Sequence, residues 1–150
     1  MIERLDNNKV VPDAMKALAQ THAYLHSRTN LPKALIDLVF LRASQINGCA
    51  YCIDMHSRDL LKEGYSLDKL LMVPVWHEAS DLFEARERAA LAWAETVTNV
   101  ATSHVPDEAY AAAATVFDEK DLADLTVAIA LMNAYNRLGA TFRLKPAAKA

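Results

Sequence analysis

Two segments with a helical pattern meet in the stretch Arg42-Ala-Ser-Gln-Ile-Asn-Gly-Cys-Ala-Tyr-Cys-Ile-Asp-Met-His56. Before it, apolar residues recur at three- and four-residue spacing from Leu35 to Ile46, which is the period of one helix face. Asn47-Gly48 interrupts this pattern. A second helix is expected from about residue 49 to residue 63, with Gly64 in the position that commonly ends helices. The stretch therefore predicts two consecutive helices joined by a short turn.

The remaining sequence shows the same helical character. Further helices are expected over about residues 12–28, 67–73, 81–101, 106–117 and 122–142. Ser66 is a candidate N-cap, Asp81-Leu-Phe-Glu84 has the form of a capping box, and Asp118 or Asp121 caps the last helix. No stretch alternates between apolar and polar residues for long enough to predict a strand. The predicted fold class is all-α, a helical bundle.

The composition is that of one globular domain. The chain has 150 residues, of which 53% are hydrophobic and 23% charged, enough to build a packed core in a single domain spanning residues 1–150. Residues 145–150 are expected to form a frayed tail. No repeat or linker divides the chain.

Charge and hydropathy exclude several classes of protein. The formal net charge is −3 and no basic cluster is present, so the sequence lacks the electrostatic signature of a nucleic-acid-binding protein. The longest apolar run, Val127 to Met132, is far shorter than the ~20 residues that span a bilayer. Met1 to Lys9 is polar and lacks the apolar core of a secretory signal. We therefore expect a cytoplasmic protein that binds neither nucleic acid nor membrane.

The two cysteines form the chemical centre of the sequence. Cys49 and Cys52 lie three residues apart, and His56 follows four residues later, so all three project from one helix face. A helix N-terminus favours the thiolate form of a cysteine, and a histidine one turn away can accept a thiol proton. In a protein without an export signal, such a pair is more often catalytic, redox-sensing or metal-binding than a structural staple.

Three interpretations of the cysteine pair remain open from the residues alone. Cys49, Cys52 and His56 could supply three ligands to a structural zinc ion, although no second cysteine pair offers a fourth. The pair could also be inert and buried. Redox or peroxidatic chemistry is the interpretation we favour, with no cofactor and no metal ion.

Polar residues near the cysteine pair are further candidates. Asp37 is the only carboxylate between Asp13 and Asp54 and lies in an apolar run, so it either faces solvent or is held by a partner. For Gln45 and Asn47, a role in the site and a role in ending the helix and forming the turn are equally good interpretations. His22 and His26 share a helix face, and we interpret them as ordinary surface or interface histidines.

The stretch from Arg42 to His56 closely resembles the core of the AhpD-like alkylhydroperoxidases of the carboxymuconolactone decarboxylase superfamily. Two other stretches are similar to its short branch: Phe83-Glu-Ala-Arg-Glu-Arg-Ala-Ala-Leu-Ala-Trp-Ala-Glu95 and Ala128-Ile-Ala-Leu-Met-Asn-Ala-Tyr-Asn-Arg137. Together they cover most of a core of about residues 31–143. The resemblance implies an all-α fold that assembles as homo-trimers or hexamers.

The resemblance also implies roles for individual residues. Cys52 would attack a peroxide substrate, Cys49 would resolve the resulting sulfenic acid, and His56 would relay the proton. A lipoyl-domain or thioredoxin-type protein would then reduce the disulfide. The family glutamate twelve residues before the first cysteine is replaced by Asp37, one methylene shorter, so that a water molecule could be needed to reach His56. Tyr51 stands where some members have a histidine.

Two alternatives remain from the resemblance and the residues. The superfamily also contains lactone decarboxylases, which do not require a cysteine pair, so the presence of both cysteines counts against that activity. A non-enzymatic redox-sensing or zinc-binding module is the other alternative.

Overall fold

The computed structural model describes residues 2–148, and all regular structure in that range is helical. The elements in chain order are α1 (Asn7–Val10), α2 (Pro12–Ser27), α3 (Lys33–Asn47), α4 (Ala50–Lys62), α5 (Leu67–Met72), the 3₁₀ turns η1 (Val73–Val75) and η2 (Ser80–Leu82), α6 (Ala85–Thr98), α7 (Val100–Ser103), α8 (Asp107–Ala114) and α9 (Glu119–Phe142). The prediction of an all-α fold is confirmed. Within residues 2–148, no helix is both long and apolar enough to cross a membrane.

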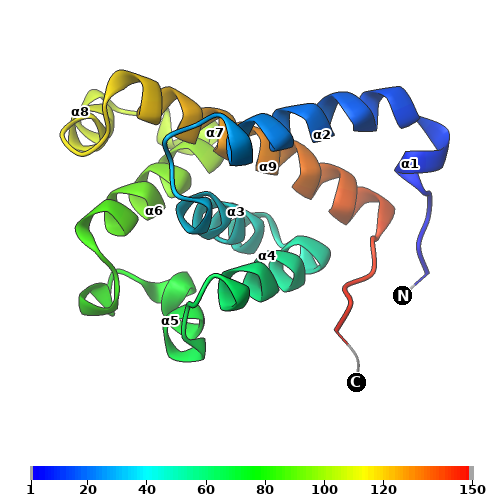
Figure 1. Cartoon of the computed structure of the whole chain (residues 1–150), viewed down its shortest axis with the longest axis horizontal. Helices are drawn as coiled ribbons and strands as arrows, with labels where there is room; N and C mark the ends of the chain where they lie inside the picture. Colours follow the sequence, from blue (N-terminus) through cyan, green and yellow to red (C-terminus); the bar gives the residue numbers. More distant parts are fainter. Residues whose placement is uncertain (1, 149–150) are drawn as a thin grey trace.

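Helix α3 forms the centre of the molecule. It contacts α4, α6 and α9, and Figure 1 shows it enclosed between α4 on one side and α2 and α9 on the other. Leu38, Val39 and Phe40 are fully buried in its middle. A helix that is apolar almost all round is stable only when other elements cover every face, and this explains why α3 lies at the core.

Most of the predicted helix boundaries are confirmed. Pro12 occupies the first turn of α2, where its missing N–H removes no helical hydrogen bond. The Ser66 side chain accepts from the Lys69 N–H at 3.1 Å, and the Asp118 side chain accepts from the Asp121 N–H at 2.8 Å. Asp118 is therefore the residue that caps α9.

The predicted helix over residues 81–101 is wrong at both ends. Phe83 is buried and its backbone is extended, with φ −116° and ψ 135°, so the chain is not helical there and α6 begins only at Ala85. The capping box is formed by Glu84 and Glu87 instead. Asn99, with φ −93° and ψ 27°, separates α6 from α7.

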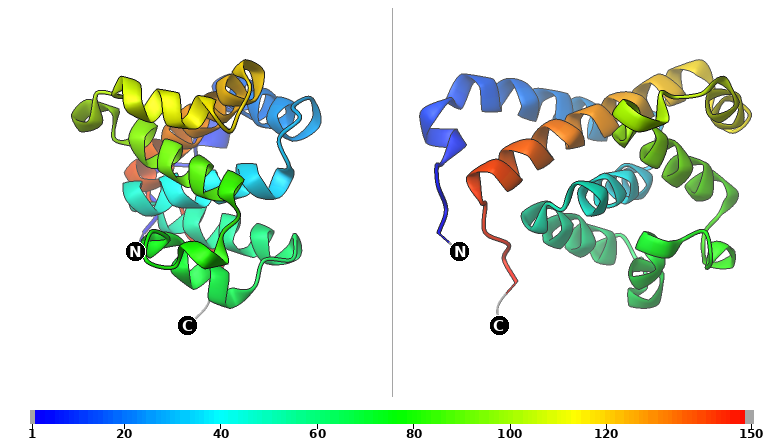
Figure 2. Two further views of the ribbon diagram at one scale, coloured as in Figure 1. Left: turned by 90° about the vertical axis from the view of Figure 1, so that its left-hand side faces the viewer. Right: turned by 180° about the vertical axis from the view of Figure 1, so that it is seen from behind.

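The first and last described segments, before α1 and after α9, both lie at one end of the bundle (Figures 1 and 2). The backbone N–H of Arg4 donates to the Phe142 carbonyl at 2.9 Å, which ties the segment before α1 to the end of α9. The described part of the predicted tail, residues 145–148, has no regular structure, and the Ala147 N–H donates to the Asp54 carboxylate at 2.9 Å. Residues 149–150 of that tail lie outside the described residues.

Candidate active site

The turn between α3 and α4 brings the two cysteines together. Gly48 ends α3 in the left-handed region, with φ 69° and ψ 33°, and Cys49 then serves as the N-cap of α4. The two residues are joined by a disulfide, with a Cα–Cα distance of 5.4 Å between Cys49 and Cys52. Their exposed fractions are 1% and 2%. The predicted position of Cys49 at a helix N-terminus is confirmed, and a substrate can reach these sulfurs only through an opening in the packed interior.

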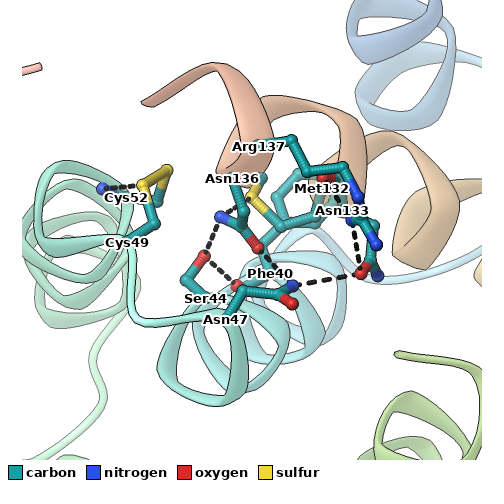
Figure 3. The surroundings of a disulfide bond; sticks show 9 residues. All are labelled: Phe40, Ser44, Asn47, Cys49, Cys52, Met132, Asn133, Asn136 and Arg137. Atoms are coloured by element: carbon teal, nitrogen blue, oxygen red, sulfur yellow. Dashed lines mark hydrogen bonds between the residues drawn. A yellow bond between two sulfur atoms is a disulfide. The ribbon is translucent and has the colours of Figure 1, made fainter. Parts of the chain in front are cut away.

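A buried polar network holds this turn against α9 (Figure 3). The Cys49 N–H donates to the Ser44 carbonyl at 3.0 Å. The amide of Asn136, a buried residue of α9, donates to the Ser44 hydroxyl at 2.9 Å and accepts from the Asn47 amide at 3.0 Å. Asn47 is therefore a cross-link between helices as well as an end-of-helix residue. Nothing in the local spacing indicated Asn136.

The same helix α9 approaches the sulfurs at Gly139. A Cβ atom at this position would lie 2.8 Å from Cys49 Sγ and 3.6 Å from Cys52 Sγ. The first distance is far below a normal contact between non-bonded heavy atoms, which is about 3.5–4.0 Å. Only glycine permits α9 to pack this closely on the disulfide.

His56 and Asp37 form a buried pair beside the disulfide. His56 Nδ1 lies 3.3 Å from Asp37 Oδ1, and the exposed fractions of the two residues are 1% and 2%. Asp37 is therefore not a surface carboxylate, and it reaches His56 directly although it is one methylene shorter than the glutamate found in the family. An imidazole bonded to a carboxylate through Nδ1 is held in one orientation and is stabilised when it takes up a proton.

Lysine side chains balance the negative charge around Asp37. The Lys33 ammonium lies 3.7 Å from Asp37 Oδ2, and the Lys62 ammonium donates to Asp59 at 2.7 Å. Asp37, His56 and Asp59 place one potential ligand atom each within 4.8 Å of one another. The adjacent ammonium groups already supply positive charge to both carboxylates, so the arrangement fits an ion-pair network that surrounds the pair.

A pocket of about 270 Å³ opens onto Cys52 and His56. Its wall is mainly apolar and comes from the beginning and the end of the chain as well as from α4. The lining residues are Asn7, Asn8, Met15, Ala19, His22, Tyr51, Cys52, Met55, His56, Met132, Tyr135, Leu138 and Leu144. Burial raises the pKa of the Tyr135 phenol, and Tyr51 is 36% exposed. The pocket can take a small and largely apolar molecule with one end against the second cysteine.

The two histidines of α2 belong to the interior side of that helix. The His22 ring stacks on Phe40 at 5.8 Å between centroids, the His26 ring meets Phe40 at 6.1 Å, and Phe40 lies 5.0 Å from His56. Burial lowers the pKa of both His22 and His26. His22 lines the pocket, a position that the interpretation of both residues as ordinary surface or interface histidines did not include. Its four-residue spacing from His26 was the one sequence signal that marked it.

The fold and the site define an all-helical protein with a buried Cys-x-x-Cys disulfide and an adjacent His–Asp pair. The model of the carboxymuconolactone decarboxylase family matches residues 12–96. The chain belongs to this family, and its fold is AhpD-like.

Three proteins illustrate the similarity. The uncharacterized protein YdfG of Bacillus subtilis is 31% identical over 149 residues, which are 99% of this chain and 100% of YdfG. A crystal structure from Agrobacterium tumefaciens, of a protein of unknown function provisionally assigned as the antioxidant defence protein AhpD, is 34% identical. Its TM-score is 0.93, covering 99% of this chain and 100% of that one. An uncharacterized peroxidase-related protein of Ralstonia eutropha with an alkylhydroperoxidase AhpD core has 26% identity and a TM-score of 0.80, covering 93% and 74% of the two chains.

Proposed function

We propose that the protein is a dithiol peroxidase that reduces alkyl hydroperoxides through Cys49 and Cys52. The observation that carries this proposal is that Cys52 and His56 line one mainly apolar pocket. Each has a buried partner: Cys49 is bonded to Cys52, and Asp37 contacts His56. Thiolate, partner thiol and oriented base are the groups that peroxide reduction by cysteine requires.

The reaction begins with the reduced dithiol. His56 accepts the thiol proton of Cys52, and the thiolate attacks the outer oxygen of the hydroperoxide. The S–O bond forms as the O–O bond breaks, giving Cys52 sulfenic acid and an alkoxide that is protonated to the alcohol. The Cys49 thiol then attacks the Cys52 sulfur, which forms the disulfide and releases water. Asp37 holds the imidazole in place and stabilises its protonated form.

A reductant must restore the dithiol after each turnover. Thiolate attack by an external dithiol on the disulfide completes the cycle, and a lipoyl-domain or thioredoxin-type protein is the proposed donor. The burial of both cysteine residues, which are 1% and 2% exposed, favours a donor whose dithiol can extend into the pocket. The proposal includes assembly as a homo-trimer or hexamer and a cytoplasmic setting, where thiols are kept reduced.

Intact-mass spectrometry of reduced protein tests the proposal. One equivalent of cumene hydroperoxide should remove two hydrogen atoms from the wild type as the disulfide forms. Cys49→Ser should instead gain one oxygen atom, because the sulfenic acid has no resolving partner, and Cys52→Ser should remain unchanged. An unchanged wild-type mass would refute the peroxidase proposal. One zinc ion per reduced chain would favour the metal-binding alternative.

A further inference from the structure

The His22 side chain has no role in the reaction as described above, yet it forms part of the wall of the pocket that holds Cys52 and His56. His22 projects from α2. The Phe40 ring lies between it and the proposed base, since this ring contacts both His22 and His56. Within residues 2–148, no protein group forms a hydrogen bond with the His22 imidazole. In the described part of the chain its ring nitrogens thus have no protein partner, on a residue that lines the space that a bound molecule would occupy.

The leaving oxygen of the hydroperoxide needs a hydrogen-bond donor. The thiolate attacks along the O–O axis, so the inner oxygen, which carries the alkyl group, lies farther from Cys52 than the oxygen that is transferred. This inner oxygen becomes an alkoxide, and an anion in a largely apolar pocket is costly unless it is hydrogen-bonded. His56 has already taken the thiol proton on the sulfur side. A second donor on the pocket wall would stabilise the charge where it develops.

We propose that the His22 imidazole donates a hydrogen bond to the leaving oxygen of the hydroperoxide. This proposal rests on the peroxidase function proposed above and adds a catalytic residue to it. As the O–O bond breaks, the His22 N–H binds the alkoxide oxygen, and the proton that His56 took from Cys52 passes to that oxygen to give the alcohol. Burial, together with the neighbouring His26 and His56, lowers the pKa of His22. The ring is therefore neutral near pH 7 and acts as a hydrogen-bond donor.

The structure supplies a matched control residue. His26 lies one turn further along α2, is partly buried like His22 and contacts the same Phe40 ring, but it does not line the pocket. Tyr135 lines the pocket and is the competing donor, since its phenol stays protonated. Replacing each of these three residues by phenylalanine keeps an aromatic ring and removes the polar hydrogen.

The test compares leaving groups in single-turnover oxidation of the reduced protein, with disulfide formation read by acid quench and intact mass. Tert-butyl hydroperoxide releases an alkoxide, whereas peracetic acid releases a carboxylate, a much weaker base that needs little help. His22→Phe should slow the first reaction about 100-fold and the second by no more than about threefold. His26→Phe should change neither rate appreciably, and His22→Gln, which retains an N–H donor, should recover part of the loss.

The outcomes separate this inference from the function on which it rests. Equal slowing of both reactions by His22→Phe, or no slowing, would overturn the role of His22 while leaving the peroxidase proposal intact. Selective slowing by Tyr135→Phe alone would assign the hydrogen bond to the tyrosine and also overturn the inference. A wild type that reduces neither peroxide would instead refute the proposed function. If His22→Phe does not fold, as judged by circular dichroism, the same leaving-group ratio measured on His22→Leu against His26→Leu decides the question, with equal ratios overturning the inference.

Discussion

Replacing Gly139 by alanine should make the disulfide easier to reduce. The added Cβ would lie 2.8 Å from Cys49 Sγ, about 0.7–1.2 Å inside a normal contact distance. Overpacking of this kind typically costs about 1–3 kcal/mol. In the oxidised protein the bond to Cys52 fixes the Cys49 sulfur in place, so the full overpacking penalty destabilises this form. In the reduced protein the Cys49 side chain can rotate away. The penalty therefore falls mainly on the disulfide form.

The shift in reduction potential follows from this difference. For a two-electron couple, about 1.4 kcal/mol corresponds to about 30 mV, so a penalty of about 1–3 kcal/mol predicts a potential about 20–65 mV more positive in Gly139→Ala. The measurement is equilibration with mixtures of reduced and oxidised dithiothreitol, followed by alkylation of free thiols and mass spectrometry.

Two controls isolate the contact from the effect of helix propensity. Ala140→Gly changes the neighbouring exposed residue of α9 and should lower stability by about 0.5–1 kcal/mol in both redox states, without moving the potential. In a Cys49→Ala background the 2.8 Å contact is removed and Cys52 Sγ, at 3.6 Å, stays at an ordinary contact distance, so Gly139→Ala should raise the free energy of unfolding by about the same amount. A potential for Gly139→Ala that is unchanged, or more negative than that of the wild type, would refute the reasoning.

Three further changes probe the framework of the site. Asp37→Asn keeps the size of the side chain but removes the charge that stabilises the neighbouring imidazolium, so single-turnover oxidation should slow by about 10²-fold, and an unaltered rate would contradict the relay. Asn136→Leu removes one hydrogen bond each from Ser44, which still donates to the Phe40 carbonyl, and from Asn47, which still donates to Asn133. Urea unfolding should show a loss of about 0.5–1.5 kcal/mol per lost hydrogen bond, and an unchanged stability would contradict a role for Asn136 in holding the turn against α9. The pKa values of His22 and His26 are lowered from 6.5, mainly by burial, so their contribution to stability is complete above that pH and is lost as the pH falls through the lowered values. Urea midpoints compared at about pH 5 and pH 7.5 should therefore differ less in a His22→Gln, His26→Gln double variant than in the wild type, and an equal difference would count against this linkage.

The part of the site that lies on α3 and α4 could be predicted because it is local. Helical spacing places Cys49 beside Cys52 and sets His56 one turn further on, and Gly48 marks the turn that puts the first cysteine at a helix N-terminus. Asp37 was identified through the family resemblance, and its apolar neighbours indicated either burial with a partner or exposure. The structure resolves that choice, since its carboxylate contacts His56.

The contribution of the more distant helices could not be predicted in this way. Asn136 and Gly139 lie more than 80 residues after Cys49, and their contacts depend on how α9 crosses the turn between α3 and α4. A periodic pattern tells which face of α9 is buried, but not which residue of that face meets a given side chain. The same holds for His22, whose helix was predicted correctly while its inward orientation was not. Phe83 is a related case, because the tertiary burial of one ring overrides a local capping pattern.

The site therefore combines two kinds of structure with different tasks. The turn between α3 and α4 carries the sulfurs, and with Asp37 and His56 it forms a unit that is buried and cross-linked by hydrogen bonds. Much of the remaining wall comes from α1, α2, α9 and the segment after α9, and two of its residues, Tyr135 and Leu144, lie beyond the 12–96 segment matched by the family model. The sulfurs are held by contacts within the turn and by Asn136 and Gly139 of α9, so the wall side chains of α1 and α2 can change without displacing them. Under the proposed peroxidase function, substrate choice would depend on the wall and redox chemistry on the turn, and His22 is the proposed point at which the wall takes part in the chemistry.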